Sequence, residues 1–166
     1  GGDGGLFWDL VDKSGEQFTV IVEDCVSIGR AFGCGLGYAV ERKGEPTVFR
    51  RCYMMCLDWA GDAGALAVGA YNTSPPESPD VVCEDCTMIS PDNAVQILYP
   101  SKYVRLELKN CRLISLNFTQ PIFTESTGII ASVVAKPEQA HIDFEDSLLM
   151  GYKVFGRSNE PKTDNP

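Results

Sequence analysis

The amino-acid sequence predicts an all-β solenoid of about five stacked coils with three strands in each coil. Three observations lead to this prediction: a degenerate unit recurs five times, apolar and polar residues alternate within it, and a further apolar stretch separates the copies. A unit of two short strands cannot bury its inner face alone, whereas stacked copies share one interior. The 166 residues, 44% of them hydrophobic and 22% charged, suffice for one domain with a real core.

Each copy consists of an alternating strand, a polar residue, a Cys or Ser, and a second alternating strand. The aligned segments are 20–29, 47–56, 81–90, 106–115 and 142–151. We call the Cys or Ser the anchor residue. The five anchors, Cys25, Cys52, Cys86, Cys111 and Ser147, are 27, 34, 25 and 36 residues apart. Residues five before, three before and two after each anchor are small or apolar, as side chains of an interior face must be.

A tight bend is predicted immediately before each anchor. The period-two alternation changes phase there, so the polar residue and its predecessor must both point outward, which one straight strand does not allow. We call this polar residue the bend residue. The five bend residues are Asp24, Arg51, Asp85, Asn110 and Asp146.

The intervals between copies supply the third strand of each coil. Their apolar stretches are 35–41, 65–71, 94–99 and 128–134. The best candidate for a helix is LFWDLVDK at 6–13, a possible cap. We therefore expect an N-terminal cap or linker over 1–17, the solenoid over 18–155 and a C-terminal tail over 156–166. The tail has the composition of a linker leaving the stack, consistent with a longer parent chain.

The repeated strand, polar residue, Cys and strand resemble the right-handed parallel β-helix superfamily, the pectate-lyase-like fold, over about 18–155. In that superfamily an Asn or Asp commonly occupies the bend, and stacked side chains run inside. Asp24, Asp85, Asn110 and Asp146 match this pattern and Arg51 departs from it. The resemblance implies a right-handed parallel β-helix. It does not imply one chemistry, because the superfamily includes lyases, hydrolases, epimerases, tailspikes and noncatalytic repeat domains.

One outer column carries charges of alternating sign, two residues before the anchors. It comprises Glu23, Arg50, Glu84, Lys109 and Glu145, and we call it the outer charged column. Stacked strands lie about 4.7–4.9 Å apart, so each acid is expected beside a base. Each exposed pair contributes only about 0–1 kcal/mol, so the expected benefit is correct register more than stability.

The seven cysteines allow three interpretations: a zinc site, reduced buried thiols and disulfides. Cys52-x3-Cys56 and Cys83-x2-Cys86 have the form of two halves of a zinc site. All four fall in inward columns, however, where reduced Cys packs as a small hydrophobe, and this is the interpretation that we favour. Disulfides between neighbouring coils are a further alternative, and because the number of cysteines is odd, they would leave one thiol free. Cys34, in the glycine-rich FGCGLG segment, is expected to be the most exposed.

The strongest candidates for catalysis are Asp80, Arg105 and His141, which the repeat places in one outer column. A carboxylate, a base and an imidazole can perform acid–base chemistry, but a salt-bridge ladder with a solvated His is the simpler interpretation. Polysaccharide-active members of the superfamily work on the sheet of the third stretches. These stretches are nearly bare of ionisable groups here, and proton transfer needs such groups.

The candidate ligand-binding residues are Tyr38, Tyr71 and Tyr99, which recur near the ends of the third stretches. A sugar ring or a partner protein can stack on such a row, although partial packing at strand ends is the simpler explanation. A net charge of −9 argues against nucleic acid. No apolar stretch approaches the roughly 20 residues of a membrane span.

The sequence therefore favours a noncatalytic scaffold or recognition segment for carbohydrate or protein, with flanking domains or an oligomer and no metal or other cofactor. The alternative is a polysaccharide lyase or glycoside hydrolase, or a fragment of one, acting on acidic polysaccharide. Calcium is then a possible cofactor.

Overall fold

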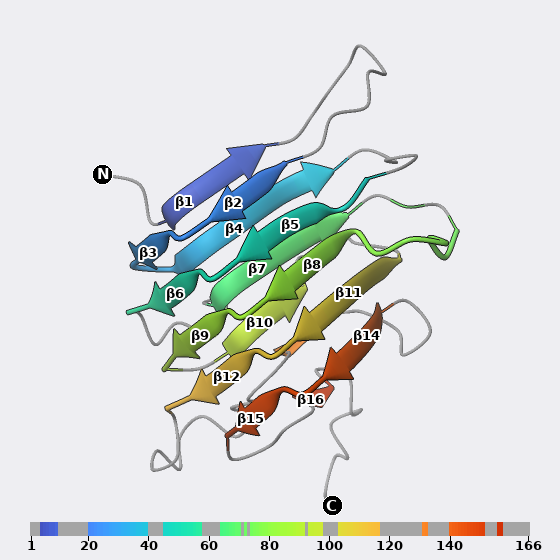
Figure 1. Cartoon of the computed structure of the whole chain (residues 1–166). Helices are drawn as coiled ribbons and strands as arrows, with labels where there is room; N and C mark the ends of the chain where they lie inside the picture. Colours follow the sequence, from blue (N-terminus) through green and yellow to red (C-terminus); the bar gives the residue numbers. More distant parts are fainter. Residues whose placement is uncertain are drawn as a thin grey trace, which may run out of the picture.

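Figure 1 shows a computed structural model of the chain, in which parallel strands lie side by side in the order of the repeats. The structure describes residues 4–9, 20–39, 45–57, 64–70, 72, 74–91, 93–97, 103–116, 131–132, 140–151 and 156–157. None of these residues lies in a helix, so the described part contains no helix long and apolar enough to cross a membrane.

The strands form three large parallel sheets and one small one. Sheet A contains β1 (Gly4–Asp9), β4 (Phe32–Ala39), β7 (Gly64–Ala70) and β10 (Asn93–Ile97). Sheet B contains β2 (Ile21–Glu23), β5 (Thr47–Arg50), β8 (Val81–Glu84), β11 (Val104–Lys109) and β14 (Ala140–Glu145). Sheet C contains β3 (Val26–Gly29), β6 (Tyr53–Cys56), β9 (Thr87–Ser90), β12 (Arg112–Ser115) and β15 (Leu148–Met150). The short β13 (Ala131–Ser132) pairs with β16 (Gly156–Arg157).

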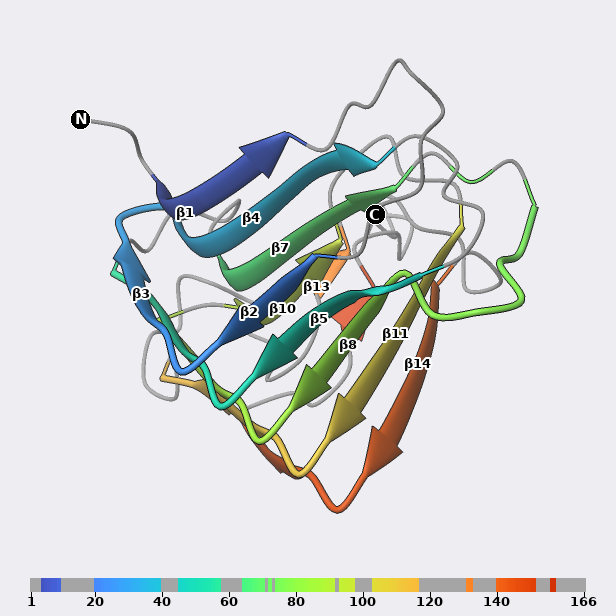
Figure 2. The same ribbon diagram turned by 45° about the horizontal axis from the view of Figure 1, so that its top comes forward.

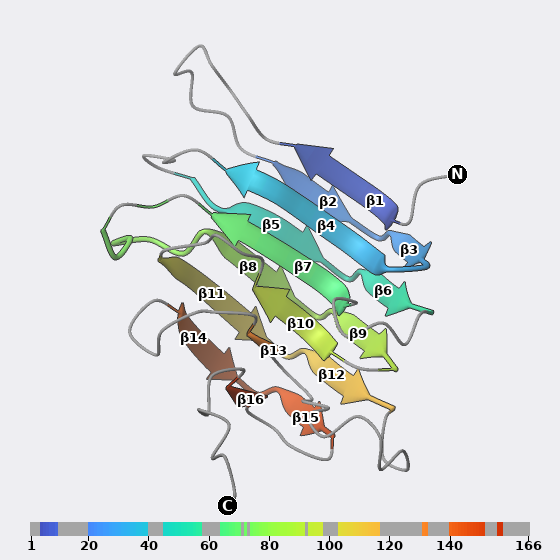
Figure 3. The ribbon, with the colours of Figure 1, turned by 180° about the vertical axis from the view of Figure 1, so that it is seen from behind.

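The alignment of the five copies is confirmed by the strand register. In sheet B, Glu23 is paired with Arg50, Arg50 with Glu84, Glu84 with Lys109, and Lys109 with Glu145. The predicted third strands are confirmed in β4, β7 and β10, which lie in order across the back of the molecule (Figure 3). The structure is thus all-β, with three parallel sheets, and it is compatible with a β-helix.

The predicted bend between the two strands of each copy is also confirmed. Figure 2 shows the chain turning sharply after β2, β5, β8, β11 and β14. The described non-glycine residues with positive φ are the five bend residues: Asp24 (55°), Arg51 (51°), Asp85 (56°), Asn110 (50°) and Asp146 (48°). Asn and Asp tolerate this left-handed conformation better than other side chains, which explains their recurrence and makes Arg51 the exception.

Apolar side chains from the three sheets fill the interior. Phe49, Met54, Leu106, Leu108 and Leu113 are at most 1% exposed. Their counterparts in the last copy, Ile142, Phe144 and Leu149, are only partly buried. The interior is therefore sealed between copies and less covered at the last one.

The expected helix at 6–13 is wrong where the structure describes it, because residues 4–9 form β1. This strand pairs in parallel with β4, Leu6 opposite Cys34 and Trp8 opposite Leu36. A helix this short is marginal in water, whereas the edge of β4 offers main-chain hydrogen bonds. Tertiary pairing therefore overrides the weak helical pattern.

Candidate functional site

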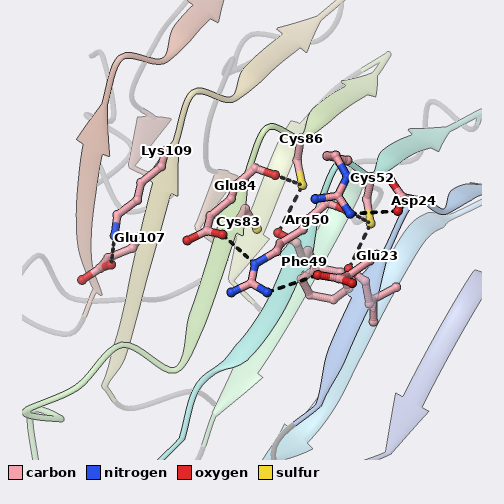
Figure 4. Close-up of polar contacts among 12 residues, drawn as sticks. Glu23, Asp24, Phe49, Arg50, Cys52, Cys83, Glu84, Cys86, Glu107 and Lys109 are labelled. Carbon is pink, nitrogen blue, oxygen red and sulfur yellow. Dashed lines mark hydrogen bonds and ion pairs between the residues drawn. The ribbon is translucent and has the colours of Figure 1, made fainter.

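The anchor residues form a column of hydrogen-bonding groups behind the bends (Figure 4). Each anchor Sγ or Oγ lies near a carbonyl oxygen of its own copy, and from the second copy on it also lies near one of the preceding copy. The Sγ of Cys52 lies 3.3 Å from the oxygen of Arg50 and 3.4 Å from that of Val22. Cys86 and Cys111 repeat this geometry.

Ser147 shows what the column does for the backbone. Its Oγ accepts a hydrogen bond from the amide of Cys111 at 3.0 Å and lies 2.9 Å from the oxygen of Glu145 and 3.1 Å from that of Leu108. The anchor amide sits where the chain changes sheets and is easily left without a partner. A small side chain that both donates and accepts meets this need, so the anchor is more than the small hydrophobe that we expected.

The exposure of two cysteines differs from the expectation. Cys34, expected to be exposed, is 1% exposed inside β4, and burial raises the pKa of its thiol to about 12. Cys25 is instead the exposed one, because it lies between β2 and β3, which are edge strands of sheets B and C among the described residues. FGCGLG was misleading because its glycines belong to a buried strand and not to a loop.

The seven cysteines are free thiols, six of them buried. Burial raises the pKa of Cys52. A hydrogen bond with Cys86 raises the pKa of Cys111, and the bonds that Cys86 receives from Cys111 and Cys83 lower its own pKa. The ionisation of the Cys86 thiol therefore depends on the hydrogen bonds that it receives from Cys111 and Cys83.

The zinc alternative finds no support in the described residues. No three His, Cys, Asp or Glu side chains among them come together as a metal ion requires. The thiol of Cys56 donates to the oxygens of Arg30 and Ala31, each at 3.1 Å, across the turn between β3 and β4. Cys52 and Cys56 thus serve different parts of the backbone.

The outer charged column forms real ion pairs around Arg50 (Figure 4). The guanidinium of Arg50 contacts the carboxylate of Glu84 at 2.7 Å and that of Glu23 at 3.1 Å. Lys109 differs from the prediction, because its ammonium contacts Glu107 of its own strand at 3.1 Å. A flexible side chain reaches an acid two residues away as easily as one on the next strand, and the sequence pattern does not distinguish the two.

The bend residues form a second polar column. Arg51 makes two hydrogen bonds to the carboxylate of Asp24, at 2.6 and 2.8 Å. The hydrogen bond from Arg51 lowers the pKa of Asp24. Farther along, the side-chain amide of Asn110 donates to Asp85. The column is therefore polar throughout but is not an unbroken amide ladder.

The structure brings Arg105 and His141 together as register partners on β11 and β14. Both contact Asp143, Arg105 through Nη2 at 3.2 Å and His141 through Nε2 at 3.1 Å. The His141 side chain is 70% exposed. Asp143, which the sequence pattern places beside this column, thus lies at its centre.

Asp80 supports the backbone next to this cluster. Its carboxylate accepts from the amide of Arg105 and from the side chain of Asn72, both at 2.8 Å. Asn72 is 6% exposed and also donates to the oxygen of Tyr103 at 2.9 Å. Asp80 thus fixes the start of β8 against β11 and ties down the intervening loop.

A surface depression of about 340 Å³ lies beside the cluster. It is lined by Glu107, Lys109, Asp143, Phe144 and Glu145. The tyrosine row stays a prediction: Tyr71 and Tyr99 lie outside the described residues, and Tyr38 is described only through the backbone of β4.

The outer face of sheet C is mostly apolar, a feature that was not predicted from the sequence. One column of this face is formed by Ile28, Met55, Ile89, Ile114 and Met150. The neighbouring column is formed by Val26, Tyr53, Thr87, Arg112 and Leu148. At its two ends the face is open, with Val26 72% and Leu148 54% exposed. The signal was present: the residues one and three after the anchors face outward by parity, yet most are apolar.

A comparison with protein-family models, curated proteins and solved structures finds no match.

Proposed function

We propose that the chain is a right-handed parallel β-helix solenoid that acts as a noncatalytic scaffold or recognition segment, for protein or carbohydrate, within a larger protein or assembly. The observation that carries this proposal is the apolar outer face of sheet C. Apolar side chains on five adjacent strands form a contiguous patch, and such patches mark surfaces that another molecule covers. This favours a protein partner over a carbohydrate.

The polar groups support a noncatalytic role. The described strands β4, β7 and β10 carry no Asp, Glu, Lys, Arg or His, so these three strands offer no carboxylate, amine, guanidinium or imidazole for proton transfer. Asp80 and Arg105 hold main-chain groups and an ion pair, as the hydrogen bonds of the loop 74–80 illustrate. Side chains committed in this way make poor general acids or bases.

The alternative is a polysaccharide lyase or hydrolase that uses the depression on β11 and β14. It is favoured by the proximity of the carboxylates of Glu107, Asp143 and Glu145 to Lys109 in one concave surface. Paired carboxylates and a base are the groups that such reactions need, with calcium as a possible cofactor.

The two functions are separated by a turnover assay. The purified chain is incubated with polygalacturonate, with and without added calcium, and reducing ends and unsaturated uronides are measured. We expect no product above that of the heat-denatured chain. Product formation that is lost in Arg105→Gln and Asp143→Asn, with the fold intact by circular dichroism, would establish the enzyme instead.

The recognition role requires an accessible apolar face, which a fluorescent hydrophobic dye can report. We expect Met55→Lys combined with Ile89→Lys to remove more than about half of the dye signal, because both lie in the middle of the patch. Thr87→Lys, on the same face, is the matched control and should leave most of it. An unchanged signal in the double variant would show that the face is already covered.

A further inference from the structure

Among the described residues, main-chain groups of the last repeat lack the partners that earlier repeats find in the copy that follows. The amide of Asp24 donates to the oxygen of Arg50 at 3.0 Å, and that of Asn110 to the oxygen of Glu145 at 2.9 Å. The oxygen of Cys111 accepts from Leu148 at 2.8 Å. Among the described residues, no carbonyl accepts from the amide of Asp146 and no amide donates to the main-chain oxygen of Ser147. Sheets B and C end here, at β14 and β15.

The interior is also less covered at this end. Ile142 and Leu149 are partly buried, whereas their register partners Leu106 and Leu113 are completely buried. Unpaired edges over an apolar interior favour the addition of a further strand, the process of β-augmentation.

The charges identify what kind of strand fits. At the opposite edge, Glu23 and Asp24 are paired with Arg50 and Arg51, at 3.1 and 2.6 Å. At the C-terminal edge, the residues beside Glu145 and Asp146 are Lys109, which contacts Glu107, and Asn110, which donates to Asp85. Glu145 and Asp146 make no ion pair with any described residue, because Lys109, the one base beside them, contacts Glu107 instead.

A second copy of the chain is a poor occupant of this edge. Head-to-tail stacking places Glu145 opposite Glu23 and Asp146 opposite Asp24, which sets like charges about 4.7–4.9 Å apart. A segment with two consecutive basic residues at its bend places opposite charges beside Glu145 and Asp146 instead.

We propose that the edge formed by β14, Asp146, Ser147 and β15 binds a strand–bend–strand segment of another protein by parallel β-augmentation, and that this segment carries two consecutive Lys or Arg residues followed by Ser, Thr or Cys. The first base lies opposite Glu145 and the second opposite Asp146. The hydroxyl or thiol accepts from the amide of Ser147, as Ser147 does from Cys111. This inference rests on the proposed recognition role and names its partner.

The chain contains a template for such a segment. Its second repeat carries Arg50, Arg51 and Cys52, and in Figure 4 Arg50 lies between two acids of neighbouring strands. A labelled peptide with the sequence of residues 45–57, with Cys52→Ser and Cys56→Ser to prevent oxidation, serves as the basic probe. The matched acidic probe differs from it only by Arg50→Glu and Arg51→Asp.

The experiment measures binding of both probes to the full chain by fluorescence anisotropy. Because an exposed ion pair changes an affinity by up to about fivefold, and two attractions become two repulsions, we expect the basic probe to bind at least about tenfold more tightly. The preference should shrink between about 0.1 M and 1 M salt, where the Debye length falls from about 10 to 3 Å.

A charge-reversed chain, Glu145→Arg with Asp146→Arg, locates the site. Arg51 shows that the bend accommodates an arginine, and thermal unfolding checks that the variant folds. We expect this variant to prefer the acidic probe. Equal affinity for both probes, binding of neither, or an unchanged preference in the variant would overturn the inference. None of these results involves turnover or the outer face of sheet C. The turnover and dye assays therefore test the proposed function independently of this binding experiment.

Discussion

Substitution of Ser147 tests whether the anchor column stabilises the fold through hydrogen bonds. Ser147→Ala removes the acceptor of the Cys111 amide and the donor to the oxygens of Glu145 and Leu108. The oxygen of Glu145 still accepts from the amide of Asn110. Cys111, however, is only 1% exposed, so its amide is left without a partner. An unsatisfied buried donor costs about 1–3 kcal/mol.

The lower half of that range applies, because Ser147 is half-buried in the last described repeat and water can approach it. We therefore expect Ser147→Ala to lower the free energy of unfolding by about 1–2 kcal/mol. For a chain of this length that is a decrease in Tm of about 2–8 °C. Urea unfolding followed by circular dichroism, under reducing conditions, measures it.

Ser147→Cys is the matched control, because cysteine is the anchor of the other four repeats. It preserves a donor and an acceptor and should change the free energy of unfolding by less than about 0.5 kcal/mol. If the Ala variant is as stable as the Cys variant, the anchor column contributes by packing alone and the hydrogen-bonding argument is wrong.

Three further outcomes are expected. A maleimide should label one cysteine of the native chain, Cys25, and Cys25→Ser should abolish labelling, since the other six are buried; labelling of several sites by mass spectrometry would contradict this. Because the hydrogen bond from Arg51 lowers the pKa of Asp24 below 3.8, the associated stability is present above about pH 4 and is lost as the pH falls below that value. Arg51→Gln should therefore flatten the acid side of the stability curve below about pH 4, and a curve parallel to the parent's would refute this assignment. Gly33→Ala should destabilise by about 1–3 kcal/mol, because its Cβ would lie 2.7 Å from backbone atoms of Ala65 and Met55. The Cβ of Gly64→Ala would meet the Gln96 side chain at 3.2 Å, so this variant should be destabilised clearly less. Thermal unfolding of both variants measures the difference.

The stacking of repeats was predictable because it depends on local alternation and on one phase change per copy. Both signals are strong in each strand pair, and the positive φ of Asp85 and Asn110 matches the predicted bends. The columns followed directly, since a parallel register carries one alignment through every sheet.

The contacts made by particular side chains were less predictable. Parity shows that Lys109 points outward but not whether it contacts Glu84, Glu145 or Glu107. The exposure of Cys25 depends on its place in the first repeat, and the burial of Cys34 on β1 pairing with β4. Asp143 became central to the polar cluster only once the reach of Arg105 was known.

The alternation of sign along the outer charged column bears on how such a chain can change its length. Excision of the second repeat alone would bring Glu23 against Glu84, whereas excision of the second and third together would leave Glu23 beside Lys109. Insertion of one repeat would likewise bring like charges together, whereas insertion of two would preserve the alternation. Gene duplication or protein engineering in this architecture is therefore expected to be tolerated best when repeats are gained or lost in pairs.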